Sequence, residues 1–205
     1  EIHVKHLGNK TCLIELQVYT NTNPAETSVR LGGGYIDFGD CTIVQISEKE
    51  SQAYPPFNSY VGYVTYSIEH TYGKLGSYRV YYRENNRNII ENLYNSAGTV
   101  FYLESYFTLS SDLDSYESPI PVSPPLFNVI MDSENSISQA ATDVNDNQLS
   151  YEITTPKAGI DEYPRYELPV GVSINPYNGL LKWASSSSQT WGEYLFSVKI
   201  SQWKN

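Results

Sequence analysis

Oxygen-bearing side chains crowd one short stretch in the second half of the chain. They fall within fifteen residues and comprise Asp132, Glu134, Asp143, Asn145 and Asp146. Calcium binds about six to eight oxygen ligands, mainly carboxylates and carbonyls, so this stretch is a candidate calcium site. The alternative is an Asx-rich turn without a metal, in which these side chains accept hydrogen bonds from nearby backbone amides. The residue types leave both interpretations open.

A catalytic centre is harder to assemble. Asp37 and Asp40 form a carboxylate pair outside the Asp-Thr/Ser-Gly context of an aspartic protease, so we expect them to accept backbone hydrogen bonds in a tight turn. Cys41 and His70 could act as nucleophile and base, but Cys12 competes as a partner for Cys41. The sequence has neither a Gly-x-Ser-x-Gly elbow nor a His-Glu-x-x-His motif. It therefore predicts a protein that is not an enzyme.

Histidine and aromatic side chains are the remaining candidates for binding. His3 and His6 alternate to opposite faces of one expected strand, which makes them a poor metal pair. Aromatic rings that reach solvent can stack on sugars or pack on a partner protein. The candidates for such ligand binding surround a proline-bearing loop and are Tyr54, Phe57, Tyr60 and Tyr63. The alternative is core and edge packing, because strands favour tyrosine in any case.

Length and charge limit the class of protein. The 205 residues correspond to one large domain or two small ones. With 23 acidic and 13 basic residues the net charge is -10, so we expect neither nucleic-acid binding nor docking on an anionic membrane. No apolar run approaches the roughly 20 residues that span a bilayer, which predicts no membrane insertion. The chain lacks an initiator methionine and a signal peptide, so we expect a mature or excised part of a longer protein.

Period-two alternation predicts strands along most of the sequence. In Thr11–Thr20 the alternation places Cys12 on the buried face. In Ser77–Arg83, Tyr78, Val80 and Tyr82 share one face, while Arg79, Tyr81 and Arg83 share the other. Short alternating strands separated by frequent turns favour an all-β fold of the sandwich type.

The proline-rich stretch Ser110–Pro125 is the best linker, because proline cannot serve in a central strand. We place the boundary near Pro121, which gives domains 1–120 and 121–205. Both halves read as sandwiches, so the sequence predicts two tandem Ig-like β-sandwich domains. Trp183 and Trp203 are expected to anchor the second core.

Two motifs carry a resemblance to known families. Asp-Phe-Gly-Asp at residues 37–40, followed by His-Thr-Tyr at 70–72 and the Tyr78–Tyr82 strand, resembles the PKD-type Ig-like domain. Leu-Pro-Val-Gly-Val-Ser-Ile-Asn at 168–175, with Asn-Gly-Leu-Leu-Lys-Trp at 178–183, is similar to cadherin-like or putative Ig domains. The segment 141–147 resembles the cadherin calcium segment, with Asn145 in place of its second aspartate.

The order of these parts resembles the amino-terminal region of secreted Bacteroidota proteins that carry a gliding-motility-associated carboxy-terminal domain for type IX secretion. The resemblance implies an extracellular or cell-surface location. Cys12 and Cys41 would be free thiols in a cytosolic protein and a disulfide in a secreted one. In PKD domains a second turn glycine stands where this chain has Cys41, and that departure favours the disulfide.

The combined expectation is a non-catalytic extracellular module of a larger secreted surface protein, which acts in adhesion, spacing or presentation. Its partners would be other domains of the same full-length protein, a cell-surface protein or a glycan. The alternative is a carbohydrate-binding module of a secreted polysaccharide-processing system. Exposed tyrosines in a groove would favour the alternative.

Overall fold

The computed structural model describes residues 1–21, 32–53, 60–85, 87–111, 116–159 and 165–204. These residues form fifteen β-strands and one short 3-10 turn, Ser96–Gly98, with no α-helix among them. The strands of every sheet pair in antiparallel fashion. The predicted all-β class is therefore confirmed.

The chain forms two compact units that are not the two halves of the sequence. Unit 1 comprises Glu1–Asn86 and Val100–Ser118, and unit 2 comprises Arg87–Thr99 and Pro119–Asn205. The chain thus passes between the units three times, after residues 86, 99 and 118. The last crossing lies next to the boundary predicted near Pro121. The first two have no counterpart in the predicted division.

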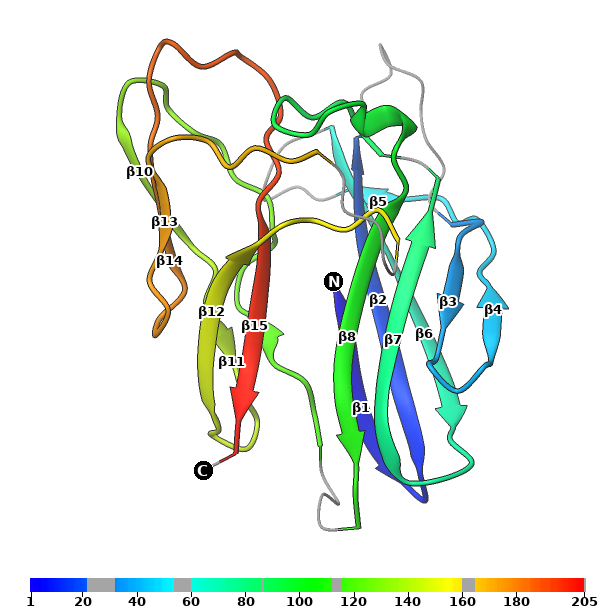
Figure 1. The fold of residues 1–205 in the computed structure, drawn as a ribbon. Coiled ribbons are helices and arrows are strands. Elements are labelled where there is room, and N and C mark those ends of the chain that lie inside the picture. The colour runs from blue at the N-terminus through cyan, green and yellow to red at the C-terminus, as the bar shows by residue number, and fades with distance from the viewer. Residues whose placement is uncertain (22–31, 54–59, 86, 112–115, 160–164, 205) are drawn as a thin grey trace. The chain divides into compact units, whose positions relative to one another are not determined.

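Two four-stranded sheets build unit 1, and Figure 1 shows them as separate layers. The first sheet has the order β1-β2-β6-β5, and the second has the order β4-β3-β7-β8. The strands are β1 (Ile2–Gly8), β2 (Thr11–Asn21), β3 (Tyr35–Asp37), β4 (Ile43–Gln45), β5 (Gln52–Ala53), β6 (Val61–Thr71), β7 (Gly76–Glu84) and β8 (Phe101–Leu109). Both sheets contribute side chains to one buried core, which is consistent with a β-sandwich.

The alternation in the sequence explains which side chains fill the unit 1 core. On β2, the predicted inward residues are buried, and the neighbouring strands β1 and β6 add Val4, Val64 and Tyr66 to the same layer. From β7, Tyr78, Val80 and Tyr82 share one face, as predicted, and that face points into the core. Among the described residues, sixteen buried side chains form this cluster, so unit 1 has an apolar core of its own.

Unit 2 is built from shorter strands. Its sheets have the orders β10-β14-β13, β11-β9 and β12-β15. The strands are β9 (Ile120–Pro121), β10 (Glu134–Ser138), β11 (Ala141–Thr142), β12 (Gln148–Thr154), β13 (Val172–Ile174), β14 (Leu180–Ala184) and β15 (Ser197–Trp203). Trp183 is buried and makes edge-to-face contacts with Tyr194 and Phe196, at centroid distances of 5.0 and 5.4 Å. The core role predicted for Trp183 is confirmed, but that for Trp203 is wrong, because its side chain is 58% exposed.

The asparagine-rich segment Arg87–Thr99 completes unit 2, although it connects β7 and β8 of unit 1. Asn92 is buried, and its side-chain amide makes two 2.9 Å hydrogen bonds to the backbone N–H and carbonyl of Leu195. Its own carbonyl accepts from the Glu167 N–H at 3.0 Å, and the Tyr94 N–H donates to the Arg165 carbonyl at 2.9 Å. The segment therefore satisfies backbone groups that unit 2 would otherwise leave unpaired.

We expect Asn92→Ala to lower the free energy of unfolding of unit 2 by about 1–3 kcal/mol, because both backbone groups of Leu195 lose this partner. The three tryptophans, Trp183, Trp191 and Trp203, all lie in unit 2, so intrinsic fluorescence during urea unfolding reports on that unit. Asn88→Ala is the matched control, because Asn88 is exposed and its side chain hydrogen-bonds to the Glu193 carboxylate rather than to backbone. Equal urea midpoints for the two variants would show that the hydrogen bonds of Asn92 to Leu195 do not stabilise unit 2 more than an exposed side-chain contact does.

The predicted Cys12–Cys41 disulfide is wrong, because both cysteines are free. Cys12 points from β2 into the core, while the Cys41 side chain is exposed. Cys41 has a φ of 74°, in the left-handed region that favours glycine. The left-handed backbone alone accounts for an unusual residue at this turn position, without a disulfide. Burial raises the pKa of the Cys12 thiol to about 11.

Cys41→Gly separates these explanations. We expect the free energy of unfolding to stay the same or rise by up to about 1 kcal/mol, because glycine relieves the left-handed strain but gains entropy in the unfolded chain. Loss of a disulfide would instead cost roughly 2–5 kcal/mol. Denaturant titration in non-reducing buffer measures the difference.

Thiol titration of the unreduced protein provides the control. Cys41 should react at once, and Cys12 should react only after denaturation, because its thiol is buried and its pKa is raised. If neither cysteine reacts in denaturant, the two thiols are bonded to each other, and the predicted disulfide would be correct.

Candidate functional site

The Asp-Phe-Gly-Asp segment at residues 37–40, here called the 37–40 turn, holds its carboxylates in structural hydrogen bonds. Asp37 accepts from the Gly39 N–H and from the Tyr81 hydroxyl, both at 2.8 Å. Gly39 has a φ of 80°, and a Cβ there would lie 2.6 Å from the Arg79 carbonyl oxygen. Only glycine therefore lets the turn approach β7 this closely.

The second half of the turn is fixed by His70. Its Nε2 lies 2.8 Å from Asp40 Oδ2, and its ring stacks on Phe38 with 4.1 Å between centroids. The Tyr72 hydroxyl donates to the Phe38 carbonyl at 3.1 Å. Burial disfavours the Asp40 carboxylate, but hydrogen bonds from His70 and Thr42 outweigh this and hold the pKa of Asp40 below its ordinary value.

These contacts confirm the turn role predicted for Asp37 and Asp40. They also give His70 a structural role, because its ring is paired with Asp40 and packed between Phe38 and Tyr72. The Cys41 side chain is exposed, and His70 is the partner of Asp40. The arrangement does not form a nucleophile–base pair.

The Asp40–His70 pair predicts an acid-sensitive contribution to stability. Because the folded-state pKa of Asp40 is lowered, its contribution is complete above the unfolded-state pKa of about 4. It is lost as the pH falls through the lower folded-state pKa. Between about pH 5 and pH 2, wild type should therefore lose more unfolding free energy than Asp40→Asn, as measured by urea titration at each pH.

Glu50→Gln removes one carboxylate from an exposed loop position and serves as the control. Its pH profile should run parallel to that of the wild type. An Asp40→Asn profile that is as steep as the wild-type profile would contradict a role for ionised Asp40.

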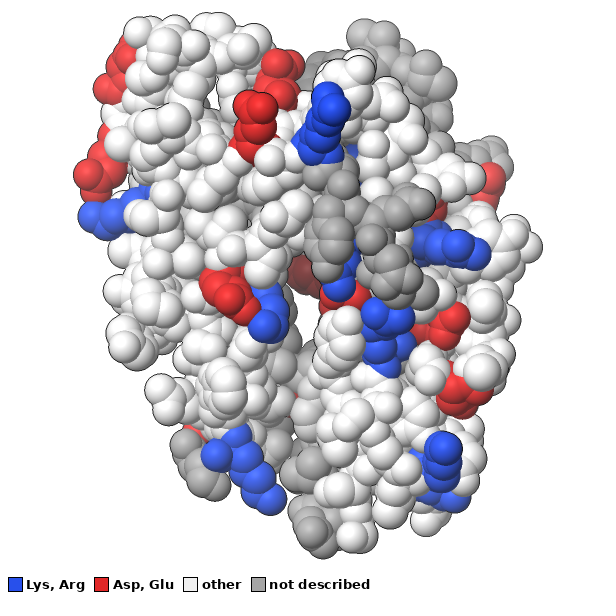
Figure 2. Space-filling view, in the orientation of Figure 1, with Lys and Arg blue, Asp and Glu red and all other residues white. Residues whose placement is uncertain are grey.

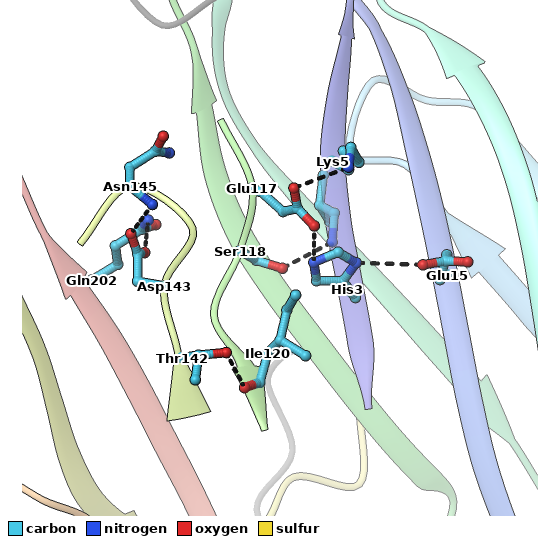
Figure 3. Close-up of polar contacts among 11 residues, drawn as sticks. His3, Lys5, Glu15, Glu117, Ser118, Ile120, Thr142, Asp143, Asn145 and Gln202 are labelled. Carbon is cyan, nitrogen blue, oxygen red and sulfur yellow. Dashed lines mark hydrogen bonds and ion pairs between the residues drawn. The ribbon is translucent and has the colours of Figure 1, made fainter. Parts of the chain in front are cut away.

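The Asp143 carboxylate, a predicted calcium ligand, is occupied by protein donors (Figure 3). Asp143 Oδ1 accepts from the Asn145 N–H at 2.8 Å, and from the backbone and side-chain amides of Asn147 at 3.0 Å each. The Gln202 side-chain amide hydrogen-bonds to its other oxygen. This is the geometry of an Asx turn fastened to β15.

The other predicted calcium ligands lie in different contacts. Asp132 accepts from the Ser187 N–H at 2.6 Å, and Glu134 pairs with Lys182 at 2.7 Å. Asn145 and Asp146 have exposed side chains in the turn that follows Asp143. Within the described residues, no group of three or more His, Cys, Asp or Glu side chains is placed to hold a metal. The structure does not bring the five residues together as one site.

We expect Asp143→Ala to lower the free energy of unfolding by about 1–3 kcal/mol, because several donors lose their acceptor. Calorimetry with chelator and with millimolar calcium should give the same loss. A wild-type transition that calcium raises, with no such rise in Asp143→Ala, would contradict the Asx-turn interpretation.

Of the predicted ligand-binding aromatics, Tyr54 and Phe57 lie outside the described residues. Tyr60 is 49% exposed. Tyr63 lies on the outward face of the first sheet, opposite Tyr19, with 6.4 Å between their rings. Binding by this group stays a prediction.

A charged cluster that the sequence did not indicate surrounds His3 in unit 1 (Figure 3). His3 lies 3.5 Å from a Glu15 oxygen and 3.4 Å from a Glu117 oxygen, and Lys5 lies 3.1 Å from the other Glu117 oxygen. His6 is opposite buried Cys12, so the opposite faces predicted for His3 and His6 are confirmed. The cluster ties β1 to β2 and to the segment at Glu117. It was missed because Glu117 is over a hundred residues from its partners.

Tyrosines and arginines alternate on the face of the β4-β3-β7-β8 sheet that points away from the core. The register places Tyr35 opposite Arg83 and Arg79 opposite Tyr106. The guanidinium carbons lie 5.6 Å from the Tyr35 centroid and 6.0 Å from the Tyr106 centroid, which is cation–π distance. We call these four residues the tyrosine–arginine face.

Polar contacts fix the side chains of this face in place. The Tyr106 hydroxyl lies 3.5 Å from an Arg79 nitrogen and 3.4 Å from a Glu104 oxygen. Tyr35 and Tyr106 are 40% and 59% exposed, whereas the nearby stacked pair Tyr81 and Tyr102 is buried. The tyrosine–arginine face therefore presents two tyrosine rings and two guanidinium groups to a ligand. Sequence alternation indicated the arginines, but only the register reveals their partners.

Charges of both signs are interspersed on the face drawn in Figure 2, where no extended basic surface is visible. No helix within the described ranges has the length and apolar character to cross a membrane. Comparison of the chain with protein-family models, curated proteins and solved structures finds no match.

Proposed function

We propose that this chain is a non-catalytic extracellular module of a larger secreted surface protein, where it acts in spacing, adhesion or presentation. The observation that carries the proposal is the commitment of its reactive side chains to the fold. Asp37, Asp40 and His70 fasten the 37–40 turn, and Asp143 fastens an Asx turn. A general base or nucleophile acts on a substrate, whereas these carboxylates and this imidazole are held in hydrogen bonds within the fold.

The finer domain assignment is part of the same proposal. We infer that unit 1 is a PKD-like and unit 2 a cadherin-like member of a tandem Ig-like pair. The two facing sheets of unit 1 and the buried Trp183 of unit 2 support this inference. The resemblance to the amino-terminal region of type IX-secreted Bacteroidota proteins supports an outer-surface location, with the other domains of that protein as partners.

Surface labelling tests the location. Antibodies against residues 1–205 should label intact cells of the source organism, and protease applied outside the cells should remove the label. Labelling that appears only after the cells are made permeable would contradict the proposal.

Carbohydrate binding is the second candidate, and the tyrosine–arginine face favours it. Exposed tyrosine rings can stack on the C–H face of a sugar, and guanidinium groups can donate to hydroxyls. Contacts with neighbouring residues already hold the side chains of the tyrosine–arginine face. Binding of a sugar would therefore cost little side-chain entropy.

Affinity electrophoresis in gels that contain neutral or acidic polysaccharides separates the two candidates. A carbohydrate-binding module would be retarded, and Tyr106→Ala would abolish the retardation. Tyr177→Ala is the control, because Tyr177 is exposed on unit 2. A spacing or presentation module would migrate equally in every gel.

A further inference from the structure

β4 stands at one end of the strand order β4-β3-β7-β8 in the second unit 1 sheet. Among the residues that the structure describes, it pairs with β3 alone and so forms a free edge. Figure 1 shows β4 at the margin of this layer, beside β3. All three of its residues are exposed, with Ile43 at 53% and Val44 at 37%. An edge of this kind presents backbone groups to which another strand can be added.

The hydrogen-bond pattern shows which backbone groups are presented. Thr42 and Ile46 bond to β3 and to its leading segment: the Phe38 N–H donates to the Thr42 carbonyl, and the Ile46 N–H donates to the Gly34 carbonyl, both at 3.0 Å. In an antiparallel pair the direction of these groups alternates along the strand. Ile43 and Gln45 therefore point their N–H and carbonyl groups away from β3.

The core is also incompletely covered at this edge. Val44 is opposite Ile36, so the two side chains share the inward face of the sheet. Ile36 is 1% exposed and Ile46 is 5% exposed, whereas Val44 remains 37% exposed. A strand added next to β4 would cover Val44 and remove apolar surface from water.

The sequence of the edge suits a second copy of the same chain. Residues 42–47 read Thr-Ile-Val-Gln-Ile-Ser, without a charge or a proline, which are two of the devices that block edge pairing. The whole chain has a net charge of -10, so two copies repel each other over most of their surfaces. The uncharged segment is also self-complementary, because Ile43 and Gln45 each present one N–H and one carbonyl on either side of Val44.

We propose that β4 pairs antiparallel with β4 of a second copy, with the two-fold axis at Val44. In this register Val44 faces Val44 of the partner subunit, and Ile43 faces Gln45 of the partner subunit. The outward groups of Ile43 and Gln45 then form four backbone hydrogen bonds, and both copies of Val44 are covered. The inference is independent of the proposed function.

The contact is short, so the dimer is weak and concentration-dependent. It strengthens as salt screens the repulsion between the two acidic chains. Sedimentation velocity from about 10 µM to about 1 mM, at low and moderate salt, should show a monomer that converts to a dimer. A monomer throughout this range would overturn the proposal.

Two substitutions test the edge. Val44→Lys places a charge at the two-fold axis, and Gln45→Pro removes an outward N–H that β3 does not use. Each should weaken dimerisation at least about tenfold, with an unchanged far-UV spectrum. Leu75→Lys is the matched control, because Leu75 is 50% exposed in the turn before β7. Equal weakening by Leu75→Lys, or none by Val44→Lys, would overturn the proposal.

Cross-linking tests the register. In a Cys41→Ser background, Val44→Cys places two cysteines directly opposite each other across the axis, within reach of a disulfide. Ile43→Cys places like residues diagonally and should cross-link much more slowly under the same mild oxidation. Equal rates for the two variants would contradict pairing about Val44.

Discussion

The fold of unit 1 depends on the contact between the 37–40 turn and the aromatic side chains around it. The turn joins β3 to β4 in one sheet, whereas His70 belongs to β6 in the other sheet. The Asp40–His70 pair, the stack of His70 on Phe38 and the bond from Tyr72 to the Phe38 carbonyl therefore fasten one sheet to the other. The bond from Tyr81 to Asp37 fixes the turn to its own sheet. The polar groups of the turn thus lie beside the apolar core, and their charged members are paired by hydrogen bonds.

The same constraint limits what these residues can do chemically. A carboxylate that accepts from two or three donors, and a histidine packed between two rings, are costly to release for catalysis. The tyrosine–arginine face and the edge at β4 are two exposed surfaces of unit 1 that this network does not use. The proposed roles in spacing, adhesion and glycan contact draw on those surfaces rather than on the buried polar network.

Local patterns predicted a large part of the structure. Period-two alternation predicted the buried face of β2 and the residues that share a face on β7, and the strand after the Asn178-Gly179 turn was predicted to bury Trp183. Contacts between residues distant in sequence could not be predicted in this way. Glu117 beside His3, and Arg87–Thr99 within unit 2, depend on how the chain returns in space. The disulfide prediction for Cys41 was wrong because a left-handed backbone at one cysteine cannot be seen in the sequence of this chain.

Native-state hydrogen exchange by NMR tests the central role of the 37–40 turn most directly. The Gly39 and Thr42 amides donate to the carboxylates of Asp37 and Asp40. If the turn fastens the two sheets, these amides should exchange only through global unfolding, with the same free energy as the amide of Val80 in the core. Exchange through local opening, far faster than at Val80, would contradict the claim that unit 1 depends on this turn.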